Sequence, residues 1–342
     1  MIRLTPWFLV LCCAGLFAQQ PELVSVQKIH DQAAYQGSTD LVRFSNLFFC
    51  AFREGKAAQG PEGRIRIVIS SNGKTWVPYA EVAEAGVDLR APKLEVTPDG
   101  KRLYLLCEGV GAARAGELNQ RPRFSTSSDG KVWTPPQKLL AQGDWLWRAT
   151  LHPSEKKFHG TVFNPHPTTG GPKPEPEWSL KTYTSNDGSV WQLSSLLQVP
   201  GQPNESVMRF LRDGRAVVLL RRDGGDKRGA IGMSSAPYRD WKFAPLPVLI
   251  QGPNLIELDD GSLIAASRGR GTTPGAHLIL SRLVLSPLSF EPVLELPSGG
   301  DCGDPGMVWH ENHLWVSYHS SHEGKTSIYV AKLRLPWVKS GQ

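Results

Sequence analysis

The chain has 342 residues, of which 40% are apolar and 20% charged, with 34 glycines and 27 prolines. This composition is typical of a globular protein rich in turns, and the length is ample for a large core. The formal net charge of +6 favours an acidic ligand, but Lys and Arg are scattered without a basic run. We therefore expect no nucleic-acid partner.

The first residues, "MIRLTPWFLVLCCAGLFAQQ", have the pattern of a secretory signal peptide. A cation at Arg3 is followed by an apolar run from Trp7 to Ala18, which ends in a small residue. The run is too short to span a membrane stably. We predict a signal peptide over 1–18, a single mature domain over 19–342, a secreted or periplasmic location and no membrane insertion.

Three cysteines remain after the signal peptide, at Cys50, Cys107 and Cys302. Their number is odd and their spacing fits no metal site. Cys50 and Cys107 lie in apolar runs, where a cysteine behaves as a small buried hydrophobe, and one disulfide is left open. The nine histidines are scattered without ligand spacing, so no metal and no cofactor are predicted.

One short motif recurs along the chain. It appears as "SSNGKTW" (70–76), "STSSDGKVW" (125–133) and "SNDGSVW" (185–191), with the tryptophans 57 and 58 residues apart. Degenerate copies follow at 234–241 and 286–290. Asn or Asp followed by Gly is typical of a hairpin turn, and a period of this size indicates stacked supersecondary units.

A second series of hairpin turns alternates with the first. Its turns, each between two short β-type runs, fall at Asn46, Gly100, Gly214, Gly261 and Asn312, and a blurred one falls within 151–163. Two hairpins make a four-stranded unit, and six such units predict an all-β fold, a six-bladed β-propeller. Closure in a ring removes exposed sheet edges, and we expect 22–29 to complete the last blade beside 327–335.

The repeated turns and the unit count resemble the sialidase superfamily, whose six-bladed propellers carry Asp-box (BNR) repeats. The resemblance covers nearly the whole mature chain. Asp boxes also occur in non-enzymatic secreted propellers, so the function has to be inferred from the site.

Three arginines occupy equal positions in their units. Arg53, Arg221 and Arg268 each stand seven residues after the turn that opens the second strand. Equal register predicts that they converge on one mouth of the central channel, where three permanent cations would repel one another unless an anion lies between them. The resemblance implies the sialidase arginine triad, which binds the substrate carboxylate.

The first strands begin at the same mouth, because they run antiparallel to the second strands. The residues at or before these starts and the channel-facing histidine are therefore site candidates: Asp88, Arg90, Arg148, Glu205, Asn254, Asp304 and His319. Asp301, three residues before Asp304, is interpreted as a turn-forming residue.

The resemblance implies that Asp88 is the acid/base residue and that Glu205 supports the nucleophile. In the family a tyrosine nucleophile precedes the proline that opens the last unit, and this chain has Asp304 there. An ionised aspartate would be repelled by a carboxylate beside the anomeric carbon, whereas a neutral tyrosine would not.

Three interpretations stay open: a glycosidase for a different sugar that uses Asp304, a sialidase-like enzyme that recruits Tyr318, and a sugar-binding propeller without catalysis. We predict a secreted, sialidase-like glycoside hydrolase that acts on an acidic terminal sugar, the alternative being a non-catalytic glycan-binding or assembly propeller. The predicted catalytic residues are Asp88, Glu205 and Asp304. The predicted sugar-binding residues are Arg53, Arg90, Arg148, Arg221, Arg268, Asn254 and His319. The sugar, the stereochemical outcome and the oligomeric state are left open.

Overall fold

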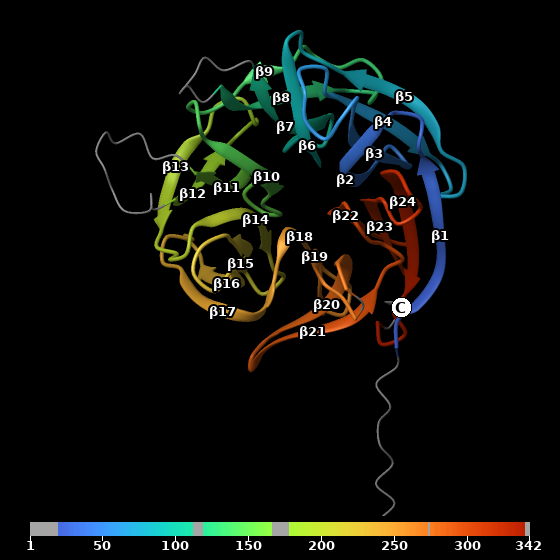
Figure 1. The fold of residues 1–342 in the computed structure, drawn as a ribbon. Coiled ribbons are helices and arrows are strands. Elements are labelled where there is room, and N and C mark those ends of the chain that lie inside the picture. The colour runs from blue at the N-terminus through green and yellow to red at the C-terminus, as the bar shows by residue number, and fades with distance from the viewer. Residues whose placement is uncertain (1–19, 112–118, 166–177, 273, 339–342) are drawn as a thin grey trace, which may run out of the picture.

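The computed structural model describes residues 20–111, 119–165, 178–272 and 274–338. Its regular elements are 24 β-strands, arranged as six four-stranded antiparallel sheets around a central channel (Figure 1). The predicted six-bladed β-propeller is thus confirmed. The predicted signal peptide lies outside the described residues and stays a prediction.

Each blade runs outward from a strand that lines the channel. Blades 1 and 2 contain β2 (Tyr35–Phe44), β3 (Leu47–Gly55), β4 (Arg64–Ser70) and β5 (Val77–Val82), then β6 (Val87–Val96), β7 (Leu103–Gly111), β8 (Gln120–Ser127) and β9 (Gln137–Lys138). Blades 3 and 4 contain β10 (Trp145–Leu151), β11 (Phe158–Asn164), β12 (Ser179–Ser185) and β13 (Gln192–Leu197), then β14 (Pro203–Phe210), β15 (Arg215–Arg222), β16 (Arg228–Ser235) and β17 (Lys242–Leu249).

Blades 5 and 6 contain β18 (Gln251–Glu257), β19 (Leu263–Arg270), β20 (Ala276–Leu285) and β21 (Leu288–Glu295), then β22 (Cys302–His310), β23 (His313–Ser320), β24 (Ser327–Arg334) and β1 (Glu22–His30). β1 pairs antiparallel with β24, from Glu22 opposite Arg334 to His30 opposite Ile328. The N-terminal strand therefore completes the last blade, as predicted, and closes the ring.

The core lies between neighbouring blades. The second strand of a blade is covered on both faces, which explains its nearly continuous apolar sequence, such as "LFFCAF" in β3. Phe48 and Cys50 of blade 1, for example, pack in one cluster with Trp315 and Val330 of blade 6. Cys50, Cys107 and Cys302 are buried free thiols, so the disulfide that the sequence left open among them is not formed.

The repeated turn joins the third and fourth strands of a blade and locks it against its neighbour. In the first copy Ser70 Oγ accepts a hydrogen bond from the Gly73 amide at 2.8 Å, Asn72 Oδ1 caps the next two amides, and Trp76 Nε1 donates to the Gly73 carbonyl at 3.1 Å. Gly73 has a φ of 69°, and a β-carbon there would lie 2.3 Å from Trp315 of blade 6. Only glycine fits both requirements. The same bonds recur at Ser127, Asp129, Gly130 and Trp133, and at Ser185, Asp187, Gly188 and Trp191.

A β-bulge interrupts each innermost strand close to its start. The register shifts lie between Gly37/Thr39, Arg90/Lys93, Leu146/Arg148, Pro203/Ser206, Gln251/Asn254 and Gly303/Gly306. At four of these bulges one residue has a positive φ, namely Ser38 (53°), Ala91 (47°), Gly252 (54°) and Asp304 (41°). Bulges of this kind redirect side chains, here at one mouth of the channel. Because serine, alanine and glycine serve at three of the positions, the backbone does not explain the aspartate at the fourth.

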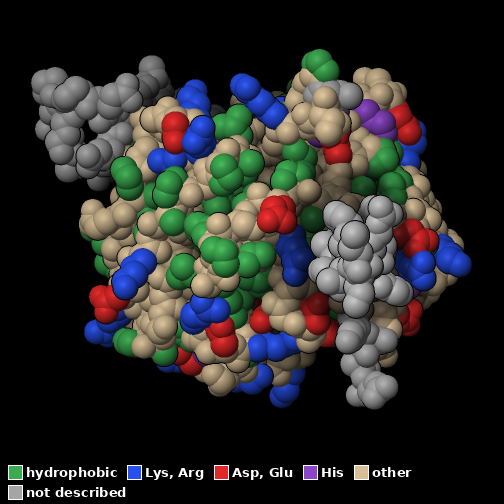
Figure 2. Space-filling model, turned by 90° about the horizontal axis from the view of Figure 1, so that it is seen from below, with side chains coloured by type: hydrophobic (Ala, Val, Ile, Leu, Met, Phe, Trp, Pro, Cys, Tyr) green, Lys and Arg blue, Asp and Glu red, His purple; other side chains and the backbone are tan. Residues whose placement is uncertain are grey.

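The outer surface carries charges of both signs close to one another. In Figure 2 the basic and acidic side chains are interspersed on the visible side of the ring, without a broad patch of one sign. Among the described residues, no helix is long and apolar enough to cross a membrane.

Candidate functional site

A small charged cavity opens where the innermost strands begin. Its volume is about 160 Å³. It is lined by residues of blades 1, 4, 5 and 6: Tyr35, Ser38, Glu205, Arg221, Gln251, Gly252, Arg268, Asp301, Cys302, Asp304 and His319. Six of these, the two arginines, the three carboxylates and His319, carry or can carry a charge, so the cavity is suited to a polar ligand. Larger cavities lie elsewhere, but this one brings several carboxylates and arginines together.

Asp304 presents its carboxylate to this cavity without a partner. Its backbone is held by Thr39, whose Oγ1 donates to the Asp304 carbonyl at 2.9 Å. One carboxylate oxygen lies 2.2 Å from the position that a β-carbon of Gly252 would occupy. The carboxylate itself forms no hydrogen bond or ion pair with any described residue. The absence of a side chain at residue 252 therefore provides the space that Asp304 uses.

Glu205 lies on the other side of Gly252. Its Oε2 accepts a hydrogen bond from the Gly252 amide at 2.7 Å, and its Oε1 accepts one from Arg221 at 3.0 Å. Burial raises the pKa of Glu205, and the negative charge of Asp304 raises it further, against the lowering effect of Arg221. A backbone nitrogen and its own β-position are about 2.5 Å apart, so the nearest oxygens of Glu205 and Asp304 are separated by about 7.5 Å at most.

The two arginines of the cavity differ in their partners. Arg221 donates to Glu205 and, through Nε, to Asp223 at 2.7 Å, so two carboxylates neutralise it. Arg268 forms no hydrogen bond or ion pair with a described residue, and its Nε is buried without an acceptor. It also borders a neighbouring cavity of about 660 Å³ together with Arg270. An unpaired, partly buried guanidinium is costly until an anion binds it, so Arg268 is the cation available to a ligand.

A tyrosine and a histidine hold Asp301 in the cavity wall. Tyr35 donates to Asp301 Oδ2 at 2.8 Å, and His319 Nε2 lies 3.5 Å from Oδ1. The Ser38 amide donates to His319 Nδ1 at 3.0 Å, so in the neutral ring the proton is on Nε2, facing Asp301. His319, Tyr35 and Arg268 together lower the pKa of Asp301 to about 2, against the effect of burial.

Asp301 and Tyr35 are not among the residues predicted for the site. Asp301 is expected to form a turn, whereas the structure places its carboxylate in the cavity with two partners. The predicted candidates at the starts of the first strands come from units two to six. Tyr35 begins the first strand of unit one, so the same register would have found it.

Arg53, Asp88 and Arg90 form a closed cluster outside the cavity wall. Asp88 accepts from Arg53 Nε at 2.7 Å, from Arg90 Nε at 2.7 Å and from the Gly60 amide at 2.9 Å. Arg53 is only 3% exposed, and its guanidinium carbon lies 5.7 Å from the centre of the Tyr35 ring, behind the cavity. The structure therefore does not bring Arg53 to the cavity with Arg221 and Arg268, and the guanidinium of Arg53 is paired with Asp88 instead.

Arg148 and Asn254 also point to other partners. Arg148 binds Asp40 with both terminal nitrogens, at 2.9 and 2.6 Å, and so ties blade 3 to blade 1 across the channel. Asn254 donates to the Pro305 carbonyl at 2.9 Å and accepts from Arg209 at 2.8 Å. Neither residue lines the cavity. Both hold the innermost strands in place.

Lys93 lies buried in the channel near these residues. Its ammonium has no hydrogen-bond partner and sits 4.5 Å from the centre of the Trp147 ring. Burial lowers the pKa of Lys93, while the charges of Asp304 and Asp40 oppose the shift. The amine therefore lies close enough to Asp304 for the two groups to influence each other's charge.

Tyr318 does not reach the cavity. It is fully buried, and its hydroxyl donates to the Pro297 carbonyl at 2.9 Å. The interpretation that recruits Tyr318 as a nucleophile is therefore wrong, because the side chain faces a neighbouring segment instead of the channel mouth.

Among the described residues, no group of three or more His, Cys, Asp or Glu side chains could hold a metal ion.

Comparisons with known proteins support the fold. The sequence matches no family model and no curated protein. Among solved structures, the chain is similar to a protein of unknown function from Dyadobacter fermentans, at 18% identity and a TM-score of 0.79, over 92% of this chain and 99% of that chain.

Two of the similar structures are glycoside hydrolases. An α-L-arabinofuranosidase from Fusarium graminearum, bound to an iminosugar inhibitor, is 13% identical with a TM-score of 0.71, over 92% of this chain and 99% of that chain. A Trypanosoma rangeli sialidase, in complex with the inhibitor DANA, is 13% identical with a TM-score of 0.66, over 92% of this chain and 58% of that chain. At these identities the likeness shows the propeller fold, and the activity has to be argued from the cavity.

Proposed function

We propose that this protein is an exported glycoside hydrolase that removes a terminal sugar bearing a carboxylate, with Asp304 and Glu205 as its catalytic pair. The observation that carries the proposal is the unpartnered Asp304 carboxylate, which faces a cavity within about 7.5 Å of Glu205. Many glycoside hydrolases use two carboxyl groups about 5 to 9.5 Å apart, and a pair of groups within about 7.5 Å of each other is compatible with this arrangement.

The environments of the two carboxyl groups suggest different roles. Burial and the Asp304 charge raise the pKa of Glu205, which favours a protonated group able to donate to the leaving oxygen. Asp304 lies near the side chains of Lys93 and Arg268, and in this proposal it is the group that reacts with the sugar. It attacks the anomeric carbon or takes a proton from the attacking water.

Arg268 supports an acidic sugar as the substrate. It is the cavity cation without a partner, and a carboxylate matches the planar guanidinium in two hydrogen bonds. The substrate carboxylate has to stand away from the anomeric carbon, because the ionised Asp304 approaches that carbon and would repel it. Asp301, ionised at neutral pH, is placed to accept hydrogen bonds from sugar hydroxyls.

The closed cluster of Arg53, Asp88 and Arg90 has a supporting role in this proposal. Its charges satisfy one another, and it lies behind Tyr35, so it positions the cavity wall without touching the substrate. The sialidase resemblance implies an acid/base role for Asp88, and in this proposal Glu205 has that role instead.

The pH dependence of hydrolysis tests the assignment of Glu205. With an aryl glycoside of a uronic acid as substrate, we expect a bell-shaped profile of kcat/KM whose basic limb lies above the pKa of an ordinary carboxyl group. Glu205→Gln should remove that limb, since the amide cannot lose a proton. A basic limb that persists in Glu205→Gln would assign the acid to another group.

A non-catalytic sugar-binding propeller is the second candidate. It is favoured by the two hydrogen bonds that already engage both oxygens of Glu205. Such a protein would bind acidic sugars through Arg268 and release no product from any glycoside. Measuring the binding of an acidic sugar together with the turnover of its aryl glycoside distinguishes the two functions.

A further inference from the structure

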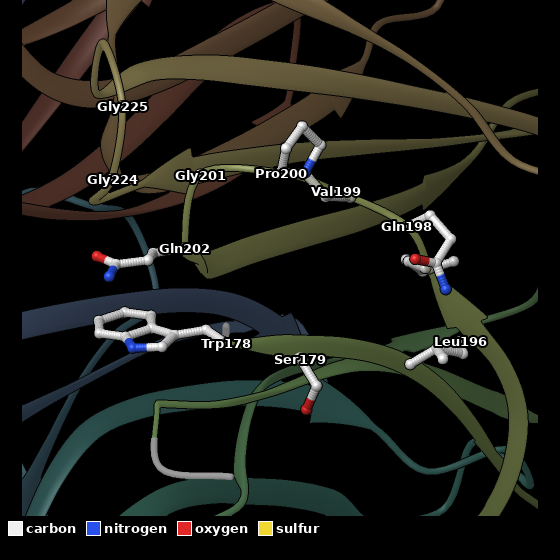
Figure 3. A pocket seen from close by; sticks show the side chains of 11 residues that line it. Trp178, Ser179, Leu196, Gln198, Val199, Pro200, Gly201, Gln202, Gly224 and Gly225 are labelled. Carbon is white, nitrogen blue, oxygen red and sulfur yellow. The ribbon is translucent and has the colours of Figure 1, made fainter. Parts of the chain in front are cut away.

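A second cavity lies at the same mouth, between blades 3 and 4 (Figure 3). Its volume is about 510 Å³. It is lined by Trp178, Ser179, Leu196, Leu197, Gln198, Val199, Pro200, Gly201, Gln202, Gly224 and Gly225. None of these side chains is charged, in contrast to the small cavity that holds Asp304 and Arg268.

This second cavity adjoins the small charged cavity that holds Asp304 and Arg268, here called the catalytic cavity. Gly201 and Gln202 come just before Glu205 in β14, while Gly224 and Gly225 follow the Arg221 segment of β15. The two segments are joined by a hydrogen bond from the Gly224 amide to the Gly201 carbonyl at 3.0 Å. Gln202 and Glu205 are three residues apart, so their α-carbons are at most about 10 Å from each other. The chain bends between them, at Gln202 with its φ of 55° and at the bulge between Pro203 and Ser206, so the two cavities adjoin each other.

Glycines allow the two segments to approach closely. A β-carbon on Gly224 would lie 3.1 Å from the Gln202 side chain, and one on Gly201 would lie 3.2 Å from the Gly224 carbonyl. Gly201 also has a φ of 86°, which other residues rarely adopt. The result is a closely packed, uncharged wall, in which the carbonyls of Gly201, Gln202 and Gly224 already accept backbone hydrogen bonds.

Trp178 supplies the features that a sugar ring requires. Figure 3 shows its indole beneath the side chain of Gln202 and the Gly224 loop in this view. The indole N–H and the Gln198 amide form no hydrogen bond with any described residue, and both side chains line the cavity. An aromatic face for the C–H side of a pyranose, with a few polar groups around it, is the usual chemistry of a carbohydrate site.

We propose that this cavity binds a neutral sugar, the one to which the acidic terminal sugar of the substrate is attached. The inference rests on the proposed function. The catalytic cavity takes the acidic ring at Arg268, and the uncharged cavity takes the next part of the glycan against Trp178. The substrate class is therefore a glycan with an acidic terminal sugar on a neutral one.

The test is a binding experiment on the full exported chain with lactose as a neutral probe and glucuronic acid as an acidic one. Binding is followed through the ¹H–¹⁵N signals of the tryptophan indoles. Lactose should shift the Trp178 signal and bind about tenfold more weakly to Trp178→Ala, while Trp178→Phe should keep most of the affinity. Glucuronic acid should bind equally to the wild-type chain and Trp178→Ala.

Trp309→Ala is the matched control, because this tryptophan lies at the far end of β22 and donates to Asp259. It should leave lactose binding unchanged. Thermal melting of each variant excludes loss of the fold as the cause. Unchanged lactose affinity in Trp178→Ala, or no shift of the Trp178 signal, would overturn the proposal.

Hydrolysis separates this inference from the proposed function. If turnover exists, Trp178→Ala should raise KM for glucuronic acid linked to a neutral sugar and leave KM for the aryl glucuronide unchanged. Equal KM values for the disaccharide in both proteins would refute the neutral subsite while the hydrolase assignment stands. Lactose binding at Trp178 without hydrolysis of any glycoside would refute the hydrolase and leave a glycan-binding site.

Discussion

Two groups of charged side chains lie at the same mouth of the propeller and differ in how they are paired. In the closed group, Asp88 accepts hydrogen bonds from both Arg53 and Arg90. In the open group, Asp304 and Arg268 face a cavity without any partner among the described residues. Pairing compensates the cost of burying a charge, and an unpaired charge at a cavity is typical of a functional site. Residues in equal register along the sequence thus occupy equal positions in the fold. Their charge partners determine whether they can bind a ligand.

The largest effect is expected from Asp304→Asn in the open group. Turnover should fall by about 10³-fold or more, because an amide can neither attack nor accept a proton. Affinity for the acidic sugar should change little, since asparagine keeps the shape and tolerates a positive φ. Steady-state kinetics and calorimetric titration measure the two quantities. Loss of binding together with turnover would indicate that Asp304 only shapes the cavity.

The closed group should respond through stability. Arg53→Met leaves the buried Asp88 with one arginine fewer, which should lower the free energy of unfolding by about 3 kcal/mol. The double variant Arg53→Met/Asp88→Leu should recover part of that loss, because it removes both charges. Chemical denaturation measures the free energy of unfolding of the wild-type chain, the single variant and the double variant, and so checks this order. A fully stable Arg53→Met that no longer binds an acidic sugar would place Arg53 in the site.

Arg268→Ala should weaken binding of an acidic monosaccharide by about 2 to 4 kcal/mol, as for the loss of a charge-assisted pair. Its thermal stability should not fall, since Arg268 forms no ion pair in the free protein. Arg270→Ala, which removes a nearby exposed cation, is the control and should bind almost as well as the wild-type chain. Similar losses in both variants would point to a diffuse electrostatic effect.

The smallest effect concerns acid stability. The pKa of Asp301 is lowered to about 2 in the folded chain, below the usual value of about 3.9. The unfolded chain binds this proton more readily, so the stabilisation is present above about pH 4 and is lost as the pH falls towards 2. Because the side chain is 41% exposed, we expect a contribution below about 1 kcal/mol.

Denaturation of Asp301→Asn and of the wild-type chain at pH 6 and at pH 2 measures this contribution. The difference in unfolding free energy should shrink at the lower pH. A difference that stays constant with pH would mean that the ion and hydrogen-bond partners of Asp301 do not stabilise its charge.

The fold could be predicted because its signals are local. The repeated turn needs a capping Ser and Asn or Asp, a glycine with positive φ and a tryptophan that bonds back to it, and these residues recur at a fixed period. Strand register then placed Arg221, Arg268, Glu205, Asp304 and His319 at one cavity.

The pairing of charges could not be predicted in the same way. Arg148 meets Asp40 across the channel, and their separation in sequence gives no sign of the contact. The three arginines in register look alike along the chain, yet of the three only Arg53 pairs with a buried carboxylate of the neighbouring blade, which it shares with Arg90. Such contacts depend on how the blades close into a ring, which local patterns do not specify.

The most direct test of the central claim is a panel of aryl glycosides offered to the wild-type chain and to Asp304→Asn. The panel contains uronic acids, nonulosonic acids and neutral sugars. We predict release of the aryl group from one or more uronic acid glycosides by the wild-type chain, none from nonulosonic acid or neutral glycosides, and none from any glycoside by Asp304→Asn. Binding of an acidic sugar without release from any member of the panel would contradict the claim that the open group is catalytic.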